Sequence, residues 1–103
     1  LFPPVSPRYT SAVKNGLENG IKECVVRNAD NQSTKFGDVQ SFSEKYQKFK
    51  IESLDLNSCY KAKAVPTTKQ NTWFKIDMDE DNGAVTKTCG DSSKRGCDEE
   101  NTW

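Results

Sequence analysis

The sequence predicts an α+β fold in which one long N-terminal helix packs on an antiparallel sheet of about four strands, followed by a C-terminal disulfide loop. Two periods in the chain support this class. Apolar residues recur every three or four positions over about residues 6–27, as in a helix, and every second position over about residues 46–89, as in strands. At 103 residues the chain has room for one core, so we expect a single domain over residues 1–103.

The N-terminal helix is predicted from about Ser6 to Arg27. Ser6 is a suitable N-cap, and Pro7 suits the first helical position because an N–H group there has no intrahelical partner. The stripe expected to be buried comprises Tyr9, Val13, Leu17, Ile21, Cys24 and Val25, with Ala12, Gly16 and Gly20 beside it. A glycine costs a helix about 1 kcal/mol relative to alanine, so we interpret Gly16 and Gly20 as points of close packing.

The opposite side of this helix carries charged residues four positions apart. The pairs are Lys14 with Glu18, Glu18 with Lys22, and Glu23 with Arg27. Each pair stabilises a helix by only a few tenths of a kcal/mol, so we predict an ordinary solvent-facing surface.

A connecting loop is predicted over about residues 28–45, because residues 28–35 are mostly polar turn formers. Within this loop Phe36, Val39 and Phe42 form an apolar face at a spacing of three. That spacing predicts one helical turn or a short 3₁₀ segment lying over the core.

The sheet is predicted over about residues 46–89. Three strands are predicted, near residues 46–54, 58–65 and 72–78, because apolar residues alternate with polar ones or supply the bulk in each. These apolar residues are Phe49 and Ile51 in the first, Tyr60, Ala62 and Ala64 in the second, and Trp73, Phe74, Ile76 and Met78 in the third. The dipeptide Asn82-Gly83 is a strong hairpin signal, since both residue types accept a positive φ. A fourth strand is therefore expected over Ala84–Cys89.

The region over about residues 89–103 has no apolar period and is predicted to be a loop. Four cysteines in a chain with a thin core indicate disulfides and an oxidising compartment. Cys24 lies on the buried stripe and Cys59 opens the second strand, so a bond between them would join the helix to the sheet. Cys89 and Cys97 are close enough in sequence to close a small loop. We therefore predict these two disulfides.

Zinc binding and nucleophilic catalysis are both disfavoured by the residue types present. Structural zinc sites usually take ligands from close pairs such as C-x-x-C, and the sequence has no such pair and no histidine. Histidine is also the usual base in nucleophilic catalysis. We expect no enzymatic activity and no cofactor.

Charge gives little guidance about partners. The chain has 15 basic and 15 acidic residues, so its formal net charge is zero and we expect no specific nucleic-acid binding. Lys94 and Arg95, inside the last disulfide loop, are the one compact basic pair on an evident protrusion. They form either a surface contact or a solubilising loop tip, and two exposed charges add too little affinity to favour the contact.

Several stretches carry a family resemblance. They are Lys22–Arg27, Asn57–Tyr60 with Ala62 and Ala64, Thr72–Phe74, Lys87–Asp91, Gly96–Cys97 and Asn101–Trp103. Over about residues 9–103 these stretches, in this order, are similar to the globular domain of type IV pilins, particularly pilin-like proteins of cyanobacteria. In that family the second half of a long helix packs on an antiparallel sheet, and a disulfide closes the C-terminal region.

The resemblance implies a structural subunit of an extracellular type IV pilus. In the family a hydrophobic helical half precedes this domain, anchors the precursor in the inner membrane and later packs in the filament core. This chain is then expected to be a truncated form whose only membrane contact belongs to that missing half. Other pilin subunits are the expected partners, the head is exposed for adhesion, motility or surface interaction, and the isolated domain should be monomeric.

Two alternatives share these features: a pseudopilin of a type II secretion system, and a free secreted binding domain stabilised by disulfides. The pseudopilin alternative implies a possible calcium site. Its weak candidate ligands are Asp77, Asp79, Asp81 and Asp91, with Asp98 and Glu99 as further donors. The first three alternate as in an EF-hand loop, but Asn82 and Thr88 occupy the positions at which that loop requires glycine and glutamate.

Overall fold

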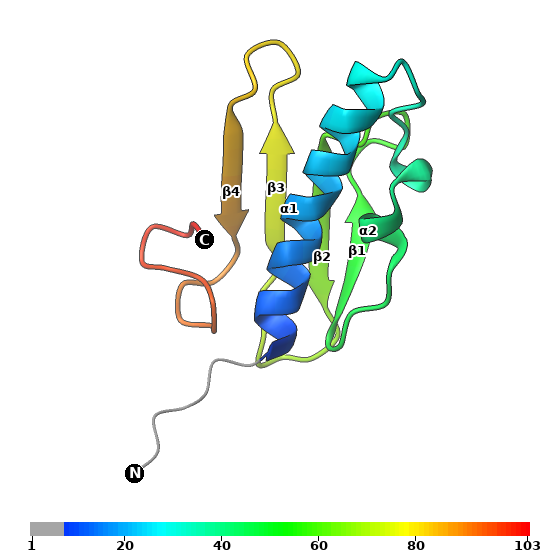
Figure 1. The fold of residues 1–103 in the computed structure, drawn as a ribbon. Helices are drawn as coiled ribbons and strands as arrows, with labels where there is room; N and C mark the ends of the chain where they lie inside the picture. The colour runs from blue at the N-terminus through cyan, green and yellow to red at the C-terminus, as the bar shows by residue number, and fades with distance from the viewer. Residues whose placement is uncertain (1–7) are drawn as a thin grey trace.

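The computed structural model describes residues 8–103, so Ser6 and Pro7, the predicted start of the helix, lie outside the described residues. The chain forms one long helix, a short helical connection and an antiparallel sheet (Figure 1). The elements are α1 (Arg8–Ala29), η1 (Phe36–Asp38), α2 (Gln40–Ser43), β1 (Phe49–Ser53), β2 (Lys61–Pro66), β3 (Phe74–Met78) and β4 (Val85–Cys89). The strands are neighbours in chain order and every adjacent pair is antiparallel. The predicted α+β architecture is therefore confirmed.

The core lies between α1 and one face of the sheet. Its largest contributions from α1 are Val13, Leu17, Ile21 and Cys24, and those from the strands are Phe49, Ile51, Ala62, Ala64, Phe74 and Ile76. α1 packs over β1, β2 and β3, and the small alanine side chains of β2 leave room for the helix between bulkier neighbours. β4 lies to the side of the helix (Figure 1). This lateral offset leaves part of β4 uncovered by the helix.

The C-terminal end of α1 lies beyond the predicted Arg27. Asn31 adopts a positive φ of 56°, and the Gln32 N–H donates to the Arg27 carbonyl at 2.8 Å. This bond closes a left-handed cap, a conformation that asparagine tolerates better than most residues. Within the described residues no helix is both long and apolar enough to cross a membrane.

The two helix glycines are contact points, as predicted. A Cβ atom on Gly16 would collide with the ring and hydroxyl of Tyr46, and one on Gly20 would collide with the ring of Phe42. Phe42 also stacks on Phe36 with ring centroids 5.2 Å apart. The connection between α1 and the sheet therefore lies directly on the helix, and the predicted short helical turn is present as η1 and α2.

Glu23 was predicted to pair with Arg27 on a solvent-facing surface, but it contacts α2 instead. Its carboxylate accepts hydrogen bonds from the Gln40 N–H at 3.0 Å and from the Ser41 hydroxyl. Unpaired N–H groups at the start of a helix are commonly satisfied by a side chain just before it, whereas here the acceptor comes from a different helix. The side chain thus fixes α2 against α1.

The β3–β4 hairpin forms with a wider loop than the predicted two-residue turn. Just beyond the ends of the two strands, the Asp79 N–H donates a hydrogen bond to the Ala84 carbonyl at 2.9 Å. Within the loop, the Gly83 N–H donates to the Asp79 carbonyl at 2.8 Å. Gly83 has a φ of 75°, but Asn82 is not among the described residues with positive φ. Instead, the Asn82 side chain accepts a bond from the Ala84 N–H. In this loop the asparagine contributes through its side chain, and Gly83 supplies the left-handed conformation.

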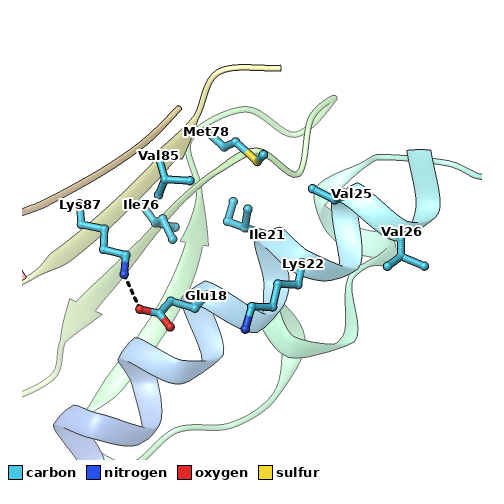
Figure 2. A pocket seen from close by; sticks show the side chains of 9 residues that line it. All are labelled: Glu18, Ile21, Lys22, Val25, Val26, Ile76, Met78, Val85 and Lys87. Carbon is cyan, nitrogen blue, oxygen red and sulfur yellow. Dashed lines mark hydrogen bonds and ion pairs between the residues drawn. The ribbon is translucent and has the colours of Figure 1, made fainter. Parts of the chain in front are cut away.

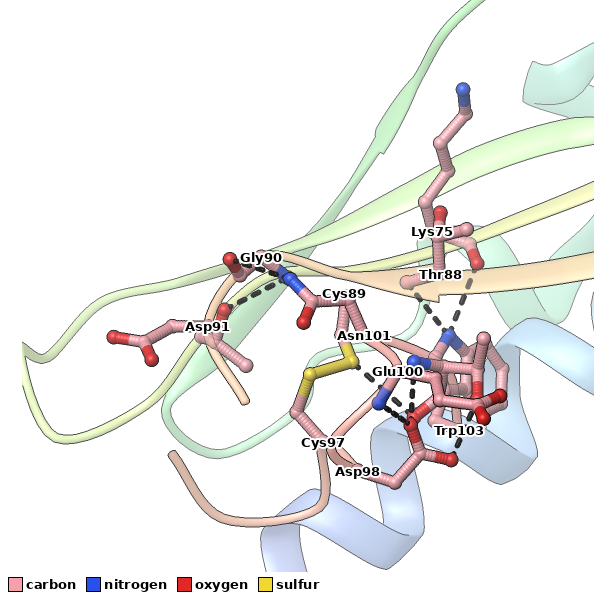
Figure 3. Close-up of a disulfide and its surroundings, with 12 residues drawn as sticks. Lys75, Thr88, Cys89, Gly90, Asp91, Cys97, Asp98, Glu100, Asn101 and Trp103 are labelled. Atoms are coloured by element: carbon pink, nitrogen blue, oxygen red, sulfur yellow. Dashed lines mark hydrogen bonds between the residues drawn. A yellow bond between two sulfur atoms is a disulfide. The ribbon is translucent and has the colours of Figure 1, made fainter. Parts of the chain in front are cut away.

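Both predicted disulfides are present, joining Cys24 to Cys59 and Cys89 to Cys97. The C-terminal region is a loop, as expected, but it folds back along β4 (Figure 3). The Cys89 N–H donates to the Asn101 carbonyl at 2.9 Å. The Trp103 indole N–H lies 2.9 Å from the Thr88 carbonyl and 3.1 Å from that of Lys75. The segment is therefore held at both ends, by the disulfide and by the indole.

Candidate interaction surface

An apolar groove lies between the C-terminal half of α1 and the β3–β4 hairpin. It has a volume of about 490 Å³. Its lining residues are Glu18, Ile21, Lys22, Val25 and Val26 from α1, Ile76 and Met78 from β3, and Val85 and Lys87 from β4 (Figure 2). Most of the surface that they present is carbon, so the groove suits an apolar binding partner.

The groove exists because the sheet is wider than the surface that α1 covers. Register pairs Ile76 with Lys87 and Met78 with Val85, so these four side chains share the face of the sheet on which α1 packs. Val85 nevertheless remains 47% exposed, because β4 lies beside the helix. The strand thus supplies one wall and α1 supplies the other.

The prediction that Val25 belongs to the buried stripe of α1 is wrong. It was expected to be buried with Cys24, yet it is 42% exposed and lines the groove. Val26 is 59% exposed. Successive residues on a helix point about 100° apart, so residues 24, 25 and 26 cannot all face one core. Cys24 takes the core position through its disulfide, and the two valines remain on the wall of the groove.

Two lysines and one carboxylate give the groove its charge. The Lys87 ammonium pairs with the Glu18 carboxylate and lies 5.0 Å from the centroid of the Trp103 ring. Glu18 was predicted to pair with Lys14 and Lys22 along its own helix, but it reaches across to Lys87 of β4 instead. Both side chains are about one-third exposed, so the pair contributes little to stability. Lys22 has no ion pair within residues 8–103, which leaves one cation for a partner.

Lys94 and Arg95 both contact other parts of the domain. The Lys94 ammonium donates to the Lys69 carbonyl at 2.9 Å, and the Arg95 guanidinium donates to the Tyr9 hydroxyl at 3.5 Å. These bonds tie the disulfide loop to the β2–β3 connection and to the start of α1. Arg95 remains exposed, so a contact to another molecule stays a prediction.

The candidate calcium ligands are not gathered into one site. Asp79 accepts bonds from the N–H groups of Asp81 and Asn82, and Asp91 accepts them from Ser93. Within residues 8–103 no three His, Cys, Asp or Glu residues lie close enough together to hold a metal ion. The remaining candidates, Asp77, Asp98 and Glu99, therefore do not complete a described site with them. The carboxylates of Asp79 and Asp91 instead accept hydrogen bonds within the turns in which they lie.

Asp98 organises the turn that precedes the last residue. Its carboxylate accepts the Thr102 hydroxyl at 2.6 Å, and the N–H groups of Thr102 and Glu100 at 2.9 Å each. These bonds favour the ionised form and lower the pKa of Asp98, the Thr102 side chain having the largest effect. The bonds place Trp103 where its indole meets β3 and β4.

Acid should therefore loosen the C-terminal segment. Because the folded-state pKa of Asp98 is lowered, its ionised form stabilises the turn above the ordinary carboxyl range. That stabilisation is lost as the pH falls from about 4 through the lowered folded-state pKa. We expect the NMR signal of the Trp103 indole N–H to shift over this range, and Asp98→Asn to remove most of the shift. Asp91→Asn is the matched control, since Asp91 also has a lowered pKa but belongs to a separate turn. Equal indole titrations in wild type and Asp98→Asn would contradict the assignment.

The groove is the surface that sequence reasoning missed. The available signal was the adjacent pair Val25-Val26, because one of two neighbouring helix residues must turn away from the core. No comparable sequence pattern indicated that β4 would form the opposite wall of the groove. Comparison of the chain with protein-family models, curated proteins and solved structures finds no match.

Proposed function

We propose that this domain is the head of a type IV pilin-like subunit and a structural component of an extracellular filament. The observation that carries the proposal is the arrangement of parts: one amphipathic helix lies along a four-stranded antiparallel sheet, and a disulfide fastens the C-terminal segment to the last strand. This is the arrangement implied by the resemblance of residues 9–103 to pilin heads.

The disulfides support an extracellular location. The Cys24–Cys59 bond joins α1 to the segment just before β2, with Cα atoms 5.9 Å apart, and no cysteine of residues 8–103 is free. Disulfides of this kind persist in oxidising compartments. In the proposal, a hydrophobic helical segment preceding this domain holds the precursor in the inner membrane and then polymerises, and the head faces outward.

The proposed partners are other subunits of the same filament. A head-to-head contact that buries less than about 800 Å² rarely holds two proteins together alone, so the isolated domain is expected to be monomeric at micromolar concentration. In a filament, packing of the preceding helices would hold neighbouring heads at high effective concentration. Weak lateral contacts then act together.

The test is to express the complete native gene in its host and look for filaments. We expect immunogold labelling of residues 8–103 to decorate extracellular filaments, and deletion of the gene to remove that label. A matched gene with an ordinary secretory signal in place of the native upstream sequence should release free protein. Release of free protein by the native gene itself, without labelled filaments, would favour the secreted binding domain and overturn the proposal.

A further inference from the structure

The strongly exposed apolar side chains of residues 8–103 lie in two places. They are Val25, Val26 and Val85 in the groove, and Leu54 and Leu56 in the loop between β1 and β2. Leu56 is the most exposed of the five, at 74%, and Leu54 is 44% exposed. Isolated exposed apolar residues are ordinary, but a projecting pair and a groove on one molecule make complementary surfaces.

The β1–β2 loop is held in a fixed turn that projects both leucines. The Asp55 N–H donates to the Ser53 hydroxyl at 3.0 Å, and the Asp55 carboxylate accepts the Asn57 N–H at 3.0 Å. The Ser58 N–H donates to the Asp55 carbonyl at 3.1 Å, and Cys59 follows at once with its disulfide to α1. A preordered loop loses little conformational freedom on binding, which favours association.

The charges of the loop and the groove are opposite in sign. Asp55 lies between the two leucines in the sequence and is exposed like them, so the loop carries one negative charge with its two apolar side chains. The groove offers apolar side chains from Ile21, Val25, Met78 and Val85, with Lys22 as its cation without an ion pair in the described chain. Opposite charges at a contact fix register and suppress wrong pairings. The loop of one copy therefore has the chemistry that the groove of another copy accepts.

The positions of the loop and the groove on the sheet limit how two copies can meet. The loop follows β1 at one edge of the sheet, and the groove includes β4 at the other edge. Both lie at the same end of the strands, because Ser53 pairs with Ala62 at the start of β2, and Met78 pairs with Val85 at the start of β4. Copies that share this contact therefore meet through opposite edges of their sheets. A contact between two different patches can repeat indefinitely, giving a ring or an open helix.

We propose that the β1–β2 loop of one copy, through Leu54, Asp55 and Leu56, docks into the groove of a neighbouring copy. The contact is heterologous, and its occupant is a second copy of this chain. The inference rests on the proposed filament function for its setting, since the weak contact acts only where heads are held together. It assigns the lateral partner surface of the head.

The first experiment uses the isolated domain. Raising its concentration from about 10 μM to about 1 mM should shift the backbone NMR signals of the loop and of the groove together, as expected for an affinity on the order of 1 mM. Leu56→Lys and Val85→Lys should each weaken this association at least about tenfold. Thr86→Lys is the matched control: Thr86 is an exposed neighbour of Val85 that points to the opposite face of the sheet, so wild-type shifts are expected.

Mixing the two variants tests the heterologous geometry. The Leu56→Lys protein retains an intact groove and the Val85→Lys protein retains an intact loop, so an equimolar mixture should recover pairing that neither shows alone. Concentration-independent spectra of the wild type up to about 1 mM would overturn the inference. So would a mixture no more associated than its components, which would indicate a symmetric contact or another occupant.

The second experiment separates this inference from the proposed function. In the complete native gene, Leu56→Lys and Val85→Lys should reduce filament number or stiffness, whereas Thr86→Lys should not. Normal filaments from both variants would overturn the docking contact and leave the filament function standing. Failure of the wild-type gene to form any filament would overturn the proposed function, whatever the NMR experiment shows.

Discussion

Replacing Leu17 with alanine is expected to lower the free energy of unfolding by about 2–5 kcal/mol. Leu17 is completely buried at the middle of α1, beside Gly16 and one turn before Gly20. Both glycines are already in contact with aromatic side chains of the connecting segment, so the backbone has little freedom to move into the space that a shortened side chain would leave. The cost should therefore include a cavity as well as the lost burial.

Chemical denaturation monitored by circular dichroism measures this effect. Asn19→Ala is the matched control, since Asn19 lies on the exposed side of the same helix and alanine has the higher helix propensity. The control should unfold at or above the wild-type midpoint. A Leu17→Ala midpoint equal to that of wild type would mean that this face of α1 does not hold the domain together.

Removing the Cys24–Cys59 disulfide by a double alanine substitution should cost about 4 kcal/mol in the chain-entropy model, as an upper estimate. The bond joins residues separated by 35 positions, whereas Cys89 and Cys97 are separated by eight, for which the same model gives about 2.5 kcal/mol. Loss of the first bond should also free the β1–β2 loop at the point where α1 holds it.

Guanidinium unfolding of the two double variants compares the bonds directly. The variant lacking the Cys24–Cys59 bond should have the lower midpoint, and the Cys89/Cys97 variant serves as its control for cysteine removal in general. The reverse order would show that the short C-terminal loop, and not the link from helix to sheet, dominates stability. Peptide mapping without reduction provides a separate check, since Cys24 joined to Cys89 or Cys97 would contradict the pairing.

The elements of the fold were predictable because each has a local period. Val13, Leu17 and Ile21 repeat at the helical spacing, and Phe49 and Ile51 at the strand spacing, so burial on one face follows from the sequence alone. The disulfide pairing was predictable for a related reason. Once Cys24 is on the buried face of the helix and Cys59 opens a strand of the sheet below it, the two are brought together by the same packing.

The parts that sequence reasoning missed depend on contacts between distant elements. Glu18 and Glu23 have oppositely charged residues one helical turn away, yet they contact β4 and α2, because packing brings donors from these other elements within reach. Trp103 follows a stretch without period, and its position depends on the Asp98 turn and on two strand carbonyls. No short-range pattern encodes such partners.

The groove was unpredictable because it depends on where α1 crosses the sheet. Periodicity identifies the faces that pack but not their lateral offset, so it did not show that β4 lies beside the helix. Val25 was assigned to the core on spacing alone, but it points about 100° away from Cys24 and is 42% exposed on the wall of the groove. The candidate site is therefore a property of the packed layers and of no single segment.

The Cys24–Cys59 bond also determines how the domain carries mechanical load. When tension is applied at the N-terminal end of α1, the covalent path from Cys24 to Cys59 runs through the two sulfur atoms, so the residues between them cannot be pulled out while the bond is intact. At about 3.3 Å per residue, a sequence separation of 35 removes about 115 Å of possible extension. The load enters the sheet beside β2, a central strand with hydrogen-bonded neighbours on both sides. Under pulling, the disulfide acts as a stiff link between helix and sheet, and the chain between Cys24 and Cys59 does not extend.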